Sequence, residues 1–169
     1  MPVLETPRLL LRPLQPDDAE AAFRWCGNPA VNRYMRYALY QRAEDIIPWL
    51  EEAAASPYEF GFVRRADGLL IGSGGVTPGD AENEPWELGY NLRRDCWGHG
   101  YATEAAMAML DYARKTFGIR DFIAYHAKAN PASGRVMEKC GFLYQHDGEY
   151  SRFDGSETFP ARFYTLRIN

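Results

Sequence analysis

The sequence has few of the residues that secreted, metal-binding and membrane-spanning proteins need. Its three cysteines, Cys26, Cys96 and Cys140, are an odd, widely spaced set, which indicates reduced thiols in a cytoplasmic protein rather than a disulfide framework. The three histidines are scattered and none lies at ligand spacing from a cysteine, so no metal site is predicted. The first residues carry neither a basic region nor an apolar run, and no later stretch could span a bilayer. Neither secretion nor a membrane partner is therefore expected.

The chain also lacks an excess of positive charge. Its 19 Lys and Arg residues are outnumbered by 23 Asp and Glu residues, and the net charge of −4 argues against nucleic acid as a partner. A hydrophobic content of 46% and a charged content of 25% are ordinary for a soluble globular protein. With 169 residues and no internal repeat or linker, the chain is expected to form a single domain over residues 1–169.

A strand, a glycine loop and a helix follow one another between residues 86 and 118. Residues 86–92 alternate in the way that a strand does, and two arginines and the run Trp-Gly-His-Gly come next. The apolar face of the following helix consists of Ala102, Ala106, Met109, Ala113 and Phe117. Gly118 stands where a helix-terminating glycine is usual. Because this arrangement aims backbone N–H groups and the positive end of a helix dipole at an anion, it predicts a phosphate-binding turn.

The turn differs from two common nucleotide-binding loops. A nucleotide-hydrolysing P-loop ends in Gly-Lys-Ser/Thr, whereas Gly100 is followed by Tyr101 and Ala102. A dinucleotide-binding fingerprint needs a third glycine, and Thr103 stands in its place, although Asp121 follows at a suitable distance. A plain strand-to-helix turn without a ligand remains the alternative to a phosphate site.

The glycine loop resembles the pyrophosphate-binding motif of the GCN5-related N-acetyltransferase (GNAT) family, Gln/Arg-x-x-Gly-x-Gly/Ala. Residues 97–102 match this motif with Trp97 in place of the usual Gln/Arg. This departure, the run Thr-Glu-Ala at residues 103–105, and the run Thr-Pro-Arg-Leu at residues 6–9 resemble one branch of the family. That branch contains the ribosomal-protein N-terminal acetyltransferases.

A second motif of the family lies late in the chain. It reads Asn-x-x-Ala/Ser, then a helix, then Gly-Phe, and it matches Asn130, Ser133, Gly141 and Phe142. The resemblance therefore covers nearly the whole chain and implies the α+β fold of the family. That fold has a six- to seven-stranded, mixed but mainly antiparallel sheet flanked by helices, and a splayed pair of parallel strands forms the acetyl-CoA cleft.

The local pattern predicts elements in the same order. Besides the helix after the glycine loop, helices are expected over residues 16–25, 31–34, 41–55 and 130–140, with Pro48 kinking or dividing the third. Strands are expected over residues 8–14, 58–64, 69–76, 86–92, 121–126, 142–150 and 162–168. The Asp-Gly pair at residues 67–68 predicts a hairpin.

The resemblance implies two candidate catalytic residues. Glu87 lies in a Glu-Leu-Gly-Tyr run that resembles Glu-Ile-Gly-Tyr in the family, where this glutamate is a common general base, sometimes acting through water. The alternative is an exposed strand glutamate, or an ion pair with an arginine. Many members protonate the leaving thiolate with a tyrosine, but Met137 stands at that position. Ser133 is the candidate donor instead, unless it only assists the start of its helix.

Backbone groups are expected to bind the reacting oxygen and the cofactor. Gly89 inside a strand indicates a bulge or a close backbone approach, and a bulge would free the N–H groups of Tyr90 or Asn91 for an oxyanion. Asn130 either binds the pantetheine arm or only caps its helix, and Gly134 indicates that a neighbour packs closely there. The full set of cofactor-binding candidates is Leu88, Tyr90, Leu92, Arg93, Arg94, Trp97, Gly98, His99, Gly100, Tyr101, Ala102, Thr103, Asn130 and Ser133.

The function implied is acetyl-CoA-dependent transfer of an acetyl group to a primary amine by a monomer or homodimer. A cationic acceptor is favoured by acidic residues near the expected active site, unless these are merely solvated: Asp80, Glu82, Glu84, Asp147, Glu149, Asp154 and Glu157. The first acceptor implied is the N-terminal α-amino group of a protein such as a ribosomal protein. A small molecule (polyamine, amino acid or antibiotic) is the second, and a catalytically silent acyl-CoA-binding module is the third reading.

Overall fold

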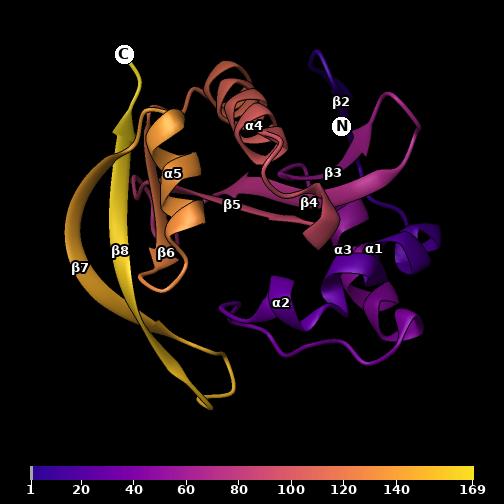
Figure 1. Cartoon of the computed structure of the whole chain (residues 1–169). Coiled ribbons are helices and arrows are strands. Elements are labelled where there is room, and N and C mark those ends of the chain that lie inside the picture. Colours follow the sequence, from indigo (N-terminus) through magenta and orange to yellow (C-terminus); the bar gives the residue numbers. More distant parts are fainter. Residues whose placement is uncertain (1) are drawn as a thin grey trace.

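A single eight-stranded sheet runs through the computed structural model, which describes residues 2–169 (Figure 1). The strands lie in the order β1-β2-β3-β4-β5-β6-β8-β7. They are β1 (Leu4–Glu5), β2 (Leu9–Arg12), β3 (Glu59–Arg64), β4 (Leu70–Thr77), β5 (Trp86–Leu92), β6 (Asp121–Ala127), β7 (Leu143–Ser151) and β8 (Thr158–Arg167). Seven of these strands were predicted from the sequence. The eighth, β1, was missed, because two residues are too few to show an alternating pattern.

The sheet opens between β5 and β6, its parallel pair. All other neighbours are antiparallel, whereas β5 and β6 pair only at Trp86↔Phe122 and Glu87↔Ile123. Beyond Glu87 the two strands diverge, so one edge of β5 has no partner strand. This confirms the predicted splayed pair, and it places the last five residues of β5 beside open space.

The helices form where proline, glycine and capping residues allow them. They are α1 (Ala19–Cys26), α2 (Pro29–Asn32), α3 (Ile47–Ala55), α4 (Tyr101–Phe117) and α5 (Pro131–Lys139), with short turns of 3₁₀-helix at η1 (Pro16–Asp18), η2 (Ala43–Ile46) and η3 (Arg94–Cys96). The helix predicted over residues 41–55 is divided as expected, because Pro48 lacks the N–H that an interior position needs and lies in the first turn of α3.

Of the three apolar clusters among residues 2–169, the two larger ones lie on opposite sides of the sheet. Helix α4 buries Ala105, Ala106 and Met109 in the larger core, together with side chains of β2 to β5. The smaller core holds Trp25 of α1 and Leu50 of α3. In Figure 1, α4 and α5 accordingly lie on one side of β5, and α1 to α3 lie on the other. The opening between β5 and β6 thus has helices on both sides of it.

The start of α5 differs from its prediction in one detail. Asn130 occupies the N-cap position, but its side chain makes no capping hydrogen bond there. The close neighbour predicted at Gly134 is the imidazole of His126, since a Cβ at Gly134 would lie 2.5 Å from its Nε2. His126 is buried, and its ring nitrogens contact the Ala127 carbonyl oxygen at 2.7 Å and the Tyr164 hydroxyl at 3.2 Å. The glycine therefore lets α5 approach β6.

Candidate active site

The glycine loop has the geometry of an anion site. Gly98 and Gly100 adopt positive φ angles of 80° and 81°, a conformation that costs other residues free energy. Gly100 is the N-cap of α4, a helix of 17 residues. The N–H groups of its first turn have no partner within the helix, and the helix dipole adds partial positive charge at this end. The loop can therefore hold a pyrophosphate.

Arg8, which precedes β2, supports this loop from the side. Its Nη1 donates to the carbonyl oxygen of His99 at 2.8 Å, and its guanidinium lies 4.4 Å from the ring centroid of Tyr101. Its Nε donates to Oε1 of Glu104 at 2.8 Å. The loop and the first turn of α4 are thus held in place by the start of the chain.

A cleft of about 720 Å³ extends from the glycine loop into the opening between β5 and β6. It is lined by most of the predicted residues: Glu87, Leu88, Tyr90, Leu92, Trp97, Gly98, Gly100, Tyr101, Ala102, Thr103, Asn130 and Ser133. A loop for the pyrophosphate at one end and an apolar channel toward Glu87 match the two parts of acetyl-CoA, its phosphates and its pantetheine arm. The residues present therefore fit this cosubstrate.

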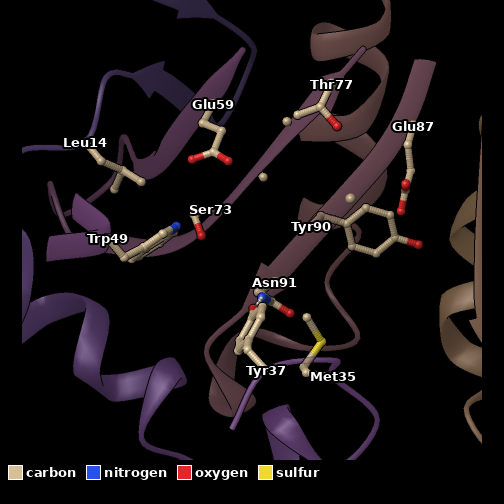
Figure 2. A pocket seen from close by; sticks show the side chains of 13 residues that line it. Leu14, Met35, Tyr37, Trp49, Glu59, Ser73, Thr77, Glu87, Tyr90 and Asn91 are labelled. Carbon is tan, nitrogen blue, oxygen red and sulfur yellow. Dashed lines mark hydrogen bonds between the residues drawn. The ribbon is translucent and has the colours of Figure 1, made fainter. Parts of the chain in front are cut away.

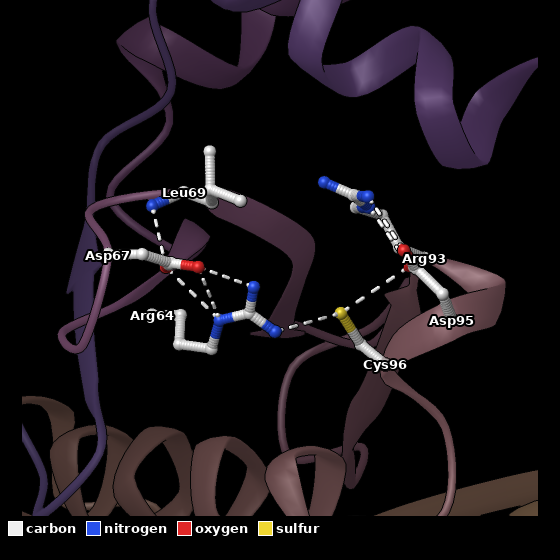
Figure 3. Close-up of polar contacts among 6 residues, drawn as sticks. All are labelled: Arg64, Asp67, Leu69, Arg93, Asp95 and Cys96. Carbon is white, nitrogen blue, oxygen red and sulfur yellow. Dashed lines mark hydrogen bonds and ion pairs between the residues drawn. The ribbon is translucent and has the colours of Figure 1, made fainter.

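Three predicted cofactor residues do not line the cleft: Arg93, Arg94 and His99. The Nη2 atom of Arg93 lies 2.8 Å from Oδ2 of Asp95, as Figure 3 shows. In the same cluster, Cys96 links Asp95 to Arg64, with Sγ 3.6 Å from Oδ1 and 3.7 Å from Nη1. The guanidinium of Arg94 instead stacks on Trp97, 4.4 Å from its ring centroid. Both arginines therefore shape the turn before the loop.

Two cations that the prediction omitted line the cleft from α5, namely Arg135 and Lys139. Both are exposed, and a spacing of four residues places them on one face of the helix. This spacing of two cations was the feature of the sequence that could have identified them. They offer positive charge to a phosphorylated ligand in the cleft.

A second, smaller cavity of about 260 Å³ lies on the other side of β5 (Figure 2). It is lined by Leu14, Met35, Tyr37, Trp49, Glu59, Ser73, Gly74, Gly75, Thr77, Glu87, Gly89, Tyr90 and Asn91. Six of these residues also line the large cleft: Met35, Tyr37, Glu87, Gly89, Tyr90 and Asn91. The two cavities therefore meet across β5 at Glu87.

The loop over residues 33–37 is fixed by the β7–β8 hairpin. The backbone N–H of Phe153 donates to the Arg36 carbonyl oxygen at 2.7 Å, and the Tyr150 hydroxyl donates to the Tyr34 carbonyl oxygen at 2.6 Å. At the end of this loop, the Tyr37 hydroxyl accepts from Nδ2 of Asn91 at 2.6 Å. These bonds hold the loop against the junction of the cavities.

Glu87 is half-buried and belongs to no ion pair among residues 2–169, so the predicted alternative of an arginine pair is not observed there. Burial raises the pKa of its carboxyl group, while the Tyr125 hydroxyl and the charge of Arg36 partly oppose that rise. The Arg36 Nη1 donates to the Tyr125 hydroxyl at 3.3 Å. A carboxylate with a raised pKa beside a cleft is suited to accepting a proton.

The bulge predicted at Gly89 is absent. The pairing of β4 with β5 is continuous through Gly75↔Gly89 and Gly74↔Tyr90. The free backbone groups arise from the opening of the sheet instead, since alternate N–H groups of β5 beyond Glu87 face the side from which β6 has diverged. A Cβ added at Gly89 would meet no atom within 4 Å. This glycine therefore leaves the surface of β5 without a side chain where the two cavities join.

Ser133 lies in the first turn of α5 and contacts Tyr90 across the cleft. The Tyr90 hydroxyl donates to the Ser133 carbonyl oxygen at 3.0 Å, and it lies 3.0 Å from Oγ of the same serine. Burial raises the pKa of Tyr90. Met137, at the position of the usual tyrosine, is buried and lines the cleft. The serine hydroxyl therefore points to a second hydroxyl group and has a fixed position.

The acidic residues of the β7–β8 hairpin are less available to bind a cationic acceptor than their number suggests. Asp147 lies 2.6 Å from Nζ of Lys128, and Glu157 lies 3.1 Å from Nη1 of Arg33. Asp154 accepts from the backbone N–H of Ser156 at 2.9 Å. A preference for a cationic acceptor cannot rest on Asp147 and Glu157, because cations of this chain already compensate their charge.

Residues 2–169 contain no helix long and apolar enough to cross a membrane. In the same span, no group of three or more His, Cys, Asp or Glu residues is arranged to hold a metal ion.

Comparison with known proteins identifies the family. Residues 8–143 match the family model described as "Acetyltransferase (GNAT) domain". The uncharacterised N-acetyltransferase YoaA of Bacillus subtilis is 32% identical over 146 residues, covering 83% of this chain and 82% of that protein. A GNAT-family acetyltransferase structure from Bacillus anthracis superposes with a TM-score of 0.88 at 23% identity, covering 98% of both chains.

A second similar structure is that of the microcin C7 self-immunity acetyltransferase MccE in complex with acetyl-CoA and AMP. It superposes with a TM-score of 0.83 at 15% identity, covering 96% of this chain and 94% of that one. At this identity the likeness concerns the fold alone. The family model and the relative in B. subtilis together decide the assignment: the chain belongs to the GNAT family of N-acetyltransferases.

Proposed function

We propose that this enzyme transfers the acetyl group of acetyl-CoA to a primary amine that occupies the small cavity beside Glu87. The observation that carries the proposal is the position of Glu87, Gly89 and Tyr90 on the boundary shared by the two cavities. A thioester in the large cleft and an amine in the small cavity would meet there. Arg135 and Lys139 would add charge to the phosphate end of the cleft.

The reaction needs a base, an oxyanion site and a departing thiolate. An amine at neutral pH is mainly ammonium, so Glu87 takes a proton before the nitrogen attacks the thioester carbonyl carbon. The oxyanion that forms accepts hydrogen bonds from the free backbone N–H groups of β5. As the intermediate collapses, the C–S bond breaks and the nitrogen loses its second proton to solvent. Ser133, held by Tyr90, gives the leaving thiolate a proton and regains one from solvent.

The geometry favours a small amine over a protein N-terminus, the acceptor that the sequence resemblance implied first. A cavity of about 260 Å³ holds a small molecule or little more than one residue of a peptide. It also presents two carboxylates, those of Glu87 and Glu59, to whatever enters. A protein N-terminus with a neutral first side chain has a single ammonium group there and would pair with only one of these carboxylates.

The test measures CoA release from acetyl-CoA with a panel of acceptors, together with mass spectrometry of the products. The panel holds aliphatic monoamines, diamines, amino acids, and peptides beginning with serine or alanine. We expect acetylated amine with CoA release for at least one small amine. Acetyl-CoA binding without any acetylated product across the panel would overturn the proposal and favour the silent acyl-CoA-binding module.

A further inference from the structure

We infer that Glu59 binds a second cationic group of the acceptor, so that the substrate class is a small diamine or another amine with a second ammonium group. This inference rests on the proposed function and narrows it. The reacting nitrogen lies beside Glu87, and the second nitrogen lies beside Glu59 at the far end of the same cavity.

The register of three strands brings the two glutamates to one face of the sheet. Glu59 pairs with Gly75, and Gly75 pairs with Gly89, so these three residues form one row across β3, β4 and β5. Glu87 lies two residues before Gly89 and therefore points to the same side. A strand spacing of about 4.8 Å and a rise of about 3.4 Å per residue place the two glutamate Cα atoms roughly 12 Å apart.

Only small residues lie between the two glutamates: Gly75 and Gly89 continue the row of Glu59, and Thr77 of β4 pairs with Glu87. Gly75 and Gly89 leave part of the cavity floor without side chains, and Figure 2 shows the Glu59 and Glu87 side chains on either side of this part and of Thr77. Adding a Cβ at Gly75 would bring it 2.5 Å from the Tyr58 carbonyl oxygen, so the floor is bare because the backbones are close. A flexible alkyl chain can therefore extend from one carboxylate to the other.

Glu59 has no cationic partner within the described part of the chain. It is half-buried and forms no ion pair among residues 2–169. Burial raises the pKa of its carboxyl group, and the charge of Glu52 adds to the rise. A partly desolvated, unpaired carboxylate is unfavourable in the free protein. A ligand ammonium would compensate it, as Arg33 and Lys128 already compensate acids of the last hairpin.

The walls suit the rest of such a ligand. Trp49, Tyr37, Leu14 and Met35 give the same cavity apolar lining. Methylene groups can pack on these side chains, and the face of an aromatic ring attracts an ammonium group. The two carboxylates have different surroundings, so the ends of a symmetric diamine are treated differently. Only the end beside Glu87 meets the thioester, and the expected product is the monoacetylated diamine.

The experiment compares putrescine and cadaverine with butylamine and pentylamine, which have the same chain lengths but one amine. We expect kcat/KM for each diamine to exceed that for its monoamine by roughly 10- to 100-fold, the range for a hydrogen-bonded charge pair. Glu59→Gln should lower kcat/KM for the diamines far more than for the monoamines, so that the preference for diamines is lost. Glu52→Gln is the matched control, because this exposed glutamate lies near Glu59 but outside the cavity lining. Glu52→Gln should keep the higher kcat/KM for diamines than for monoamines.

Equal kcat/KM for diamine and monoamine, or an equal loss for both in Glu59→Gln, would overturn the inference but leave the proposed function standing. If no amine in the panel is acetylated, the proposed function fails and the inference is decided by binding. Calorimetry with the CoA-bound protein should then detect putrescine binding in the wild type and in Glu52→Gln but not in Glu59→Gln. The absence of binding to the wild type, or equal binding to all three, would overturn it.

Discussion

The Oγ1 atom of Thr6 donates a hydrogen bond of 2.5 Å to Oε2 of Glu104, a residue 98 positions later in the chain. The same carboxylate accepts from the backbone N–H of Arg8 at 2.9 Å. The two sequence runs that suggested one branch of the family, at residues 6–9 and 103–105, are therefore in direct contact. Because Arg8 also binds the glycine loop, this contact connects the start of the chain to the large cleft.

Replacing Glu104 with Gln should destabilise the protein in a pH-dependent way. Burial alone would raise the pKa of Glu104, but hydrogen bonds from Thr6 and Arg8 outweigh it and hold the pKa below its ordinary value. A carboxyl group with a lowered pKa adds stability above its unfolded pKa, near 4.5, and loses it as the pH falls further. We expect Glu104→Gln to be about 1–3 kcal/mol less stable at pH 7, with a smaller difference near pH 3. Urea denaturation at both pH values measures this.

Glu20 provides the control for that measurement. It is an exposed glutamate of α1, and Glu20→Gln should leave stability within about 0.5 kcal/mol at either pH. A Glu104→Gln difference that stayed constant from pH 7 to pH 3 would contradict the assignment of the stabilisation to the ionised carboxylate.

Placing a carboxylate at Gly98 should abolish acetyl-CoA binding while the fold persists. Gly98 and Gly118 both have positive φ, and a Cβ at either would meet no atom within 4 Å. Gly98→Asp adds a negative charge where the pyrophosphate should lie, whereas Gly118→Asp adds the same group at the far end of α4. Calorimetry should detect binding only in Gly118→Asp. Equal affinities of the two variants would exclude the glycine loop as the phosphate site.

Local signals in the sequence predicted much of the fold and most of the residues that line the large cleft near the glycine loop. The glycine loop, the division at Pro48 and the close packing at Gly134 each follow from backbone constraints of one or two residues. Such constraints do not depend on the rest of the fold. The cleft lining around Gly98, Gly100 and Ser133 agrees with the residues predicted for it.

The cavity proposed for the acceptor could not be predicted, because it depends on pairing between strands. Glu59 and Glu87 share a cavity only through the register of β3 with β4 and of β4 with β5. The sequence alone does not show which residues of neighbouring strands pair. The contacts of Arg93 with Asp95 and of Arg94 with Trp97 also appear only in the folded structure. In the sequence, both arginines resemble phosphate ligands.

Two glycine substitutions should separate stability from turnover. Gly134→Ala forces a Cβ to within 2.5 Å of His126 Nε2, and this overpacking should cost about 1–3 kcal/mol. Gly89→Ala has open space for its methyl group, so the melting temperature should not fall. The methyl group would nevertheless displace the reactants where the cavities join, and turnover should drop by roughly 10-fold or more. Thermal melts and steady-state kinetics on both variants test this, and full activity of Gly89→Ala would contradict the proposed junction.

Tyr90 and Ser133 should act as one unit. Ser133→Ala removes the proton donor proposed for the leaving thiolate, and the loss in kcat should be modest, because a thiol pKa near 8.5 lets the thiolate depart unaided. Tyr90→Phe removes the hydroxyl that positions Ser133. We expect the double variant to be no slower than the slower single variant, with unchanged acetyl-CoA affinity. Additive losses in a double-mutant cycle would mean that the two hydroxyl groups act separately.

Glu87→Gln should give a more stable but much slower enzyme. Because burial raises the pKa of Glu87, its ionised form lowers stability at neutral pH, and stability rises as the pH falls through that raised pKa. A neutral glutamine should therefore increase the melting temperature at pH 7, with a smaller gain toward pH 4.5. A thermal melt that shows such a gain excludes unfolding as the cause of lost activity.

The turnover of Glu87→Gln should fall by roughly 10²–10⁴-fold at pH 7, the usual range for losing a general base, with little change in acetyl-CoA affinity. The deficit should shrink as the pH rises, because more of the amine then arrives without its proton. Tyr125→Phe should shift the acidic limb of the kcat/KM profile to higher pH, since the Tyr125 hydroxyl lowers the pKa of Glu87. Glu82→Gln, in the exposed loop before β5, is the control and should match the wild type. If Glu87→Gln kept full activity at pH 7 with every acceptor, the proton would have to leave through water to backbone carbonyl groups instead.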